Sequence, residues 1–85
     1  MIQVTIQDND PIRQFIEAKA LHSGRSRNEI AEEIIRDGFV ALVRSLHEQF
    51  MRGEMSQGVM AERLGIGRVD LIHLLERLDL QVTNL

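Results

Sequence analysis

The first residues of the chain alternate strictly between apolar and polar side chains. Residues 2–7 read Ile-Gln-Val-Thr-Ile-Gln, and this period of two is typical of a half-buried β-strand. No second convincing strand lies nearby in the sequence, so its backbone groups need partners from elsewhere. The simplest partner is the same strand of a second copy, paired antiparallel across a two-fold axis. An edge strand that pairs with the C-terminal tail of a monomer is the alternative.

The rest of the first half has the spacing of two helices. Asp10 is a good N-cap, Pro11 suits the first helical position, and Gly24 is a natural terminator, so we expect a helix between them. Ser26 and Glu29 then form a capping box, which should satisfy exposed backbone donors at the start of a second helix. Apolar residues at helical spacing carry this helix to about residue 52, before a terminating glycine.

The second half predicts two shorter helices and a turn. Ser56 caps the first, Gly65 takes the turn, and the last helix runs from about Arg68 to Leu78, with the spacing of a helix-turn-helix. The tail, residues 80–85, is expected to be a strand or frayed. The predicted fold is therefore mainly α, with a ribbon-forming strand in residues 1–45 and a helix-turn-helix-like hairpin in residues 46–85.

Composition excludes several classes of site. The 85 residues contain no cysteine, which rules out disulfides and cysteine-ligated zinc, and the net charge of −3 argues against a general polyanion binder. His22, His47 and His73 are scattered, so we expect them at the surface or at helix ends, with no metal. No serine has a histidine–acid pair that could activate it, so we expect the protein not to be an enzyme. We also expect no cofactor. No run approaches the roughly 18 apolar residues of a membrane span, and no signal peptide precedes the domain, so we expect a cytoplasmic protein.

The order of strand, helix, glycine turn and capped second helix over residues 1–43 resembles the ribbon-helix-helix family of MetJ-, Arc- and CopG-like repressors. The resemblance implies that alternate strand residues read bases in the major groove and that the start of the second helix holds a phosphate. The implied base readers are Gln3, Thr5 and Gln7, and the implied phosphate-binding residues are Arg25, Ser26, Arg27 and Asn28.

Residues 46–82 resemble a family of small bacterial and archaeal predicted antitoxins. The shared pattern is the Arg-Gly-Glu turn at residues 52–54, the Ser56 cap and the Leu-Leu-Glu-Arg helix at residues 74–77. Members are commonly encoded beside a PIN-domain ribonuclease toxin. One arginine, two aliphatics and an acid on the outward face of the last helix suit a protein better than a DNA groove, although DNA reading is the alternative. These outward residues are Arg68, Val69, Asp70, Ile72 and His73.

Together these features predict a DNA-binding antitoxin and autorepressor of a type II toxin–antitoxin system. Its expected partners are double-stranded operator DNA, a second copy of itself or a higher oligomer, and a toxin of the PIN-domain type, with no membrane. A stand-alone ribbon-helix-helix transcriptional repressor is one alternative. A dimeric protein–protein adaptor that binds no DNA is another.

Overall fold

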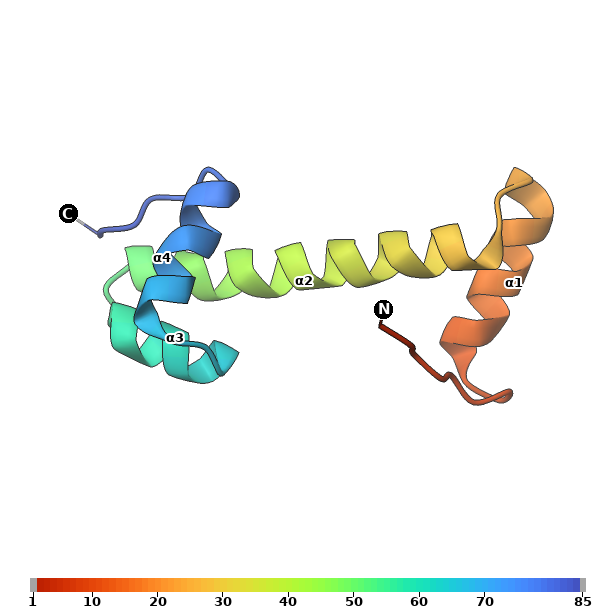
Figure 1. The fold of residues 1–85 in the computed structure, drawn as a ribbon, viewed down its shortest axis with the longest axis horizontal. Coiled ribbons are helices and arrows are strands. Elements are labelled where there is room, and N and C mark those ends of the chain that lie inside the picture. The colour runs from red at the N-terminus through yellow and green to blue at the C-terminus, as the bar shows by residue number, and fades with distance from the viewer. Residues whose placement is uncertain (1, 85) are drawn as a thin grey trace. The chain divides into compact units, whose positions relative to one another are not determined.

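The computed structural model describes residues 2–84, in which every regular element is a helix. Figure 1 shows their order: α1 (Pro11–Ser23), α2 (Arg27–Met51), α3 (Gln57–Leu64) and α4 (Arg68–Arg77). None of these helices is long and apolar enough to cross a membrane. The chain divides into two compact units, the N-terminal unit (residues 1–39) and the C-terminal unit (residues 40–85), and the division lies within α2.

The strand predicted for residues 2–7 is wrong. These residues have no regular secondary structure, and no β-strand occurs between residues 2 and 84. Alternation favours a strand only where a neighbouring segment supplies hydrogen-bond partners. Here the Ile6 carbonyl accepts from the Arg13 side chain, and the Gln7 carbonyl accepts from the Asp10 amide, both at 3.1 Å. The ribbon-helix-helix resemblance, the strand pairing across a homodimer and the pairing with the C-terminal tail are therefore all contradicted.

The ends predicted for α1 are confirmed. The Asp10 carboxylate accepts from the backbone N–H of Ile12 at 2.9 Å, and Pro11 occupies the first turn, where no N–H partner is needed. At the other end Gly24 has a left-handed φ of 70°, and its N–H donates to the Ala20 carbonyl at 3.1 Å. Ile16 is the one buried residue of α1.

α2 continues without interruption through Gly38 and ends one residue before the predicted end. Gly53, with a φ of 77°, turns the chain, and its N–H donates to the Phe50 carbonyl at 3.0 Å. Only Ile16 and Ile30 are buried apolar side chains among the described residues of the N-terminal unit. This unit therefore has almost no core of its own.

The C-terminal unit has a contiguous hydrophobic core. Ser56 caps α3 by accepting from the backbone N–H of Val59 at 3.1 Å, and Gly65 ends α3 with a φ of 72°. α3, the turn at Gly65 and α4 lie within a residue or two of where the sequence predicts them. The buried core residues are Val43, Leu46, Phe50, Met55, Met60, Ala61, Leu71 and Leu75.

Candidate DNA- and protein-binding surfaces

The three predicted base readers are exposed, but they do not form a separate polar face. Gln3 and Thr5 line the same groove as Ile2 and Val4, whereas Gln7 lies outside the groove lining. Without a strand, the two faces that alternation would create are not separated. Apolar and polar side chains of the N-terminal segment therefore share one surface.

This groove, which we call the N-terminal groove, has a volume of about 1020 Å³ and lies wholly within the N-terminal unit. Its second wall is the first half of α2. Ile35 and Phe39 on this wall are 53% and 44% exposed, and Ile2 and Val4 on the other are more exposed still. The groove is thus open to solvent, and half of its ten lining residues are apolar. Its remaining lining residues on α2 are Asn28, Ala31, Glu32 and Arg36.

The start of α2 is capped by the predicted serine–glutamate pair, with one difference. The Ser26 hydroxyl accepts from the backbone N–H of Glu29 at 3.1 Å, as expected of an N-cap. The Glu29 carboxylate accepts from the Ser26 hydroxyl, also at 3.1 Å, rather than from the Ser26 backbone. One capping bond is therefore confirmed, and the Glu29 carboxylate holds the hydroxyl in position for it.

We expect Ser26→Ala to lower the free energy of unfolding by about 0.5–2 kcal/mol, the usual cost of removing a serine cap. Ser45→Ala is the matched control, because Ser45 is exposed within α2 and takes no part in a cap. Urea unfolding followed by circular dichroism measures both. Equal effects of the two substitutions would show that the Ser26 cap does not stabilise α2.

Arg25, one of the predicted phosphate-binding residues, is held by acidic side chains of α2. Its Nη1 lies 2.6 Å from Glu33 Oε2, and its Nε lies 3.9 Å from Glu29 Oε2. The Nζ of Lys19, on α1, lies 3.5 Å from the other Glu33 oxygen. The hydrogen bond from Arg25 and the charges of Arg25 and Lys19 lower the pKa of Glu33 below its ordinary value of 4.5. Glu33 thus forms ion pairs with both Arg25 and Lys19.

Arg27, the other predicted phosphate-binding cation, is also near a carboxylate. Its Nη1 lies 3.7 Å from Glu17 Oε1 on α1, and the Nε of Arg13 lies 3.4 Å from the same oxygen. The side chain of Arg27 is 68% exposed, more than that of its partner Glu17. Asn28 is exposed as well and lines the N-terminal groove. The predicted phosphate-binding residues are therefore all exposed, and both arginines among them are ion-paired.

The predicted partner-binding residues lie along α4, in the C-terminal unit. Val69 is 67% exposed, and Arg68, Asp70 and His73 are exposed too. Ile72 differs, because it is half-buried rather than fully outward. This surface mixes one apolar side chain with both signs of charge.

His47 is a residue that the sequence analysis placed wrongly. It is 8% exposed, and its Nε2 is hydrogen-bonded to the backbone carbonyl of Gln81 at 2.8 Å. The spacing of His47 from Val43 and Phe50, four residues after one and three before the other, puts it on the apolar stripe of α2. That spacing is the sequence signal for a buried side chain at residue 47.

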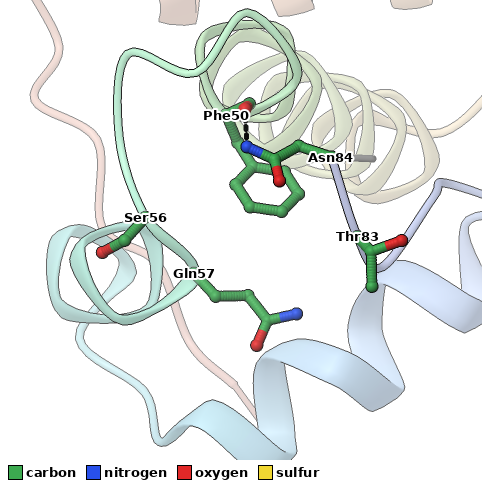
Figure 2. A pocket seen from close by; sticks show the side chains of 5 residues that line it. All are labelled: Phe50, Ser56, Gln57, Thr83 and Asn84. Carbon is green, nitrogen blue, oxygen red and sulfur yellow. Dashed lines mark hydrogen bonds between the residues drawn. The ribbon is translucent and has the colours of Figure 1, made fainter.

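Two amides also hold the tail. Gln57 Nε2 donates to the Val82 carbonyl at 2.6 Å, and its Oε1 accepts from Arg68 at 3.2 Å. Asn84 donates to the Phe50 carbonyl at 3.3 Å, the dashed line in Figure 2. Residues 80–84 are therefore neither a strand nor frayed but are held by side-chain hydrogen bonds, and Leu85 lies outside the described residues. The pocket of about 330 Å³ beside it has no ionisable side chain in its lining of Phe50, Ser56, Gln57, Thr83 and Asn84 (Figure 2).

No group of three or more histidine, aspartate or glutamate side chains in residues 2–84 is placed to hold a metal ion. No model of a protein family, no curated protein and no solved structure matches the chain.

Proposed function

We propose that the chain is a homodimeric DNA-binding regulator of the antitoxin type. In this proposal the N-terminal unit self-associates and contacts DNA, and the C-terminal unit binds a protein toxin, such as a PIN-domain ribonuclease. The observation that carries the proposal is the open N-terminal groove, in a unit whose described residues bury only two apolar side chains.

Self-association follows from how little the N-terminal unit buries. Units this small rarely bury enough apolar surface to be stable alone, and oligomerisation is a common solution. Glu32 and Arg36 line the groove one helical turn apart. A two-fold axis could place each of them against the opposite charge of the second copy. A second copy would therefore cover the apolar walls and match the charges.

DNA contact would use the surface around the start of α2. Arg25, Arg27 and Asn28 lie there, and arginine suits bidentate contacts with phosphate. Because the chain has a net charge of −3, binding has to depend on such local cations and weaken with salt.

Protein contact is assigned to α4 because of its chemistry. Val69 and Asp70 are poor groups for a DNA groove, which favours donors and positive charge. An exposed aliphatic side chain beside charges of both signs is better suited to the surface of another protein.

The test is a titration of the full chain into labelled DNA from the region preceding its own coding sequence, followed by fluorescence anisotropy. We expect binding at low salt, a dissociation constant that rises with salt, and weaker binding to scrambled DNA of the same length. Addition of the protein encoded by the neighbouring gene should form a larger complex. Absence of DNA binding at low salt would contradict the regulatory role.

Val69→Glu separates the two surfaces in the same titration. We expect it to weaken the toxin complex at least about tenfold, as for a central contact of an interface, and to leave DNA binding unchanged. Loss of DNA binding with the toxin complex intact would instead assign α4 to DNA.

A dimeric adaptor that binds no DNA is the second candidate. The observation in its favour is that carboxylates pair with both arginines at the start of α2. The low-salt titration decides between the two functions.

A further inference from the structure

We propose that Glu33 limits the affinity of the chain for DNA by competing with phosphate for Arg25 and Lys19. This inference rests on the proposed DNA contact at the start of α2. It adds a regulatory role for a carboxylate that pairs with one cation on α1 and another in the turn into α2.

The geometry makes Glu33 a direct competitor. One of its oxygens lies 2.6 Å from Arg25 Nη1, and the other lies 3.5 Å from Lys19 Nζ. Both carboxylate oxygens are thus occupied, in the manner in which two phosphate oxygens would be. The same ion pair raises the pKa of Arg25, first through the hydrogen bond with Glu33 and then through its charge. A phosphate must displace this carboxylate before it can bind Arg25 fully.

The cost of displacement remains modest because the ion pair is open to solvent. The side chains of Arg25 and Glu33 are 40% and 36% exposed, so water and salt screen the attraction. Glu33 therefore weakens DNA binding without abolishing it. Glu17 acts in the same direction on Arg27 but less strongly, since the two groups lie 3.7 Å apart.

The ion pair also joins α1 to α2, through Lys19, and a purely structural role predicts a different result. If Glu33 only stabilised the N-terminal unit, its removal would destabilise the unit and weaken DNA binding. If it competes with phosphate, its removal strengthens binding. The sign of the change in affinity therefore distinguishes the two roles.

The experiment compares Glu33→Gln with Asp37→Asn in the full chain, using the labelled DNA described above. Both substitutions remove one negative charge from α2, at positions one helical turn apart, but no ion pair is found for Asp37 in residues 2–84. Asp37 also lies outside the lining of the N-terminal groove, so its substitution leaves the proposed dimer contact intact. We expect Glu33→Gln to tighten binding about two- to fivefold at low salt, the effect of an exposed ion pair, and more than Asp37→Asn. The difference should vanish at high salt.

Glu17→Gln provides a second variant on a different helix, and we expect a smaller gain from it. Equal affinities of the Glu33→Gln and Asp37→Asn variants, or weaker binding by Glu33→Gln than by the parent chain, would overturn the inference while the proposed function stands. If Glu33→Gln bound DNA and the parent chain did not, the result would support the inference. If neither the parent chain nor any variant binds DNA at low salt, both the inference and the proposed DNA contact fail.

Discussion

We expect Leu71→Ala to unfold most of the C-terminal unit at room temperature. Leu71 is fully buried on α4, in the only contiguous core found within residues 2–84. Truncation of a buried leucine costs about 2–5 kcal/mol, because apolar contacts are lost and a cavity remains. A core in a unit this small supplies no more than about 3–5 kcal/mol of net stability. The substitution therefore removes most or all of it.

Amide hydrogen exchange measures this effect unit by unit. We expect protection at Met60 and Leu75, both fully buried, to fall by at least about two orders of magnitude in Leu71→Ala, which corresponds to the loss of about 3 kcal/mol. Val69→Ala is the control on the same helix, since a 67% exposed side chain should change stability by less than about 0.5 kcal/mol. Equal protection in the two variants would contradict the placement of Leu71 in the core.

The second large effect is expected at the N-terminal groove. Replacing both Ile35 and Phe39 with glutamate should abolish self-association, because dimerisation would bury four unpaired carboxylates per dimer against apolar walls. Loss of such central contacts raises a dissociation constant by about a hundredfold or more. Sedimentation equilibrium of the full chain measures the dissociation constant of the dimer. We expect a dimer for the parent chain and a monomer for the double variant.

Leu21→Glu is the matched control for this experiment. Leu21 is an apolar residue of α1 that is 82% exposed and lies outside the groove lining, so the variant should remain dimeric. Phe39→Ala offers a milder change, for which we expect weakened rather than abolished association. A monomeric parent, or a Leu21→Glu variant that dissociates as readily as the double variant, would contradict the proposed interface.

The helices were predictable because their signals are local. An N-cap, a proline at the first turn and a left-handed glycine act within one turn of the helix, and Asp10, Pro11 and Gly24 have the expected roles. The same holds for Ser56 and Gly65 around α3. Prediction from the sequence was successful where a residue and its partner lie within four positions of each other.

The errors concern contacts between distant positions. A strand requires a second extended segment that periodicity alone does not reveal, and no strand partner for residues 2–7 lies within the described chain. The bond between His47 and Gln81 joins residues 34 positions apart, and the one between Arg25 and Glu33 crosses the turn into α2. Of the candidate sites, the positions on the surface could be predicted, whereas the carboxylates that pair with the arginines could not.

In the proposed dimer, the scarcity of buried side chains among the described residues of the N-terminal unit makes the folding of that unit depend on concentration. Where a unit gains its core from a second copy, mass action sets the folded fraction, and dilution favours the open form. The C-terminal unit has its own core and does not share this dependence. The two units of one chain would therefore respond differently to the rate of protein synthesis. The N-terminal unit would be ordered, and able to bind DNA as proposed, only above a threshold concentration of the chain. Below that concentration it would be open to proteases.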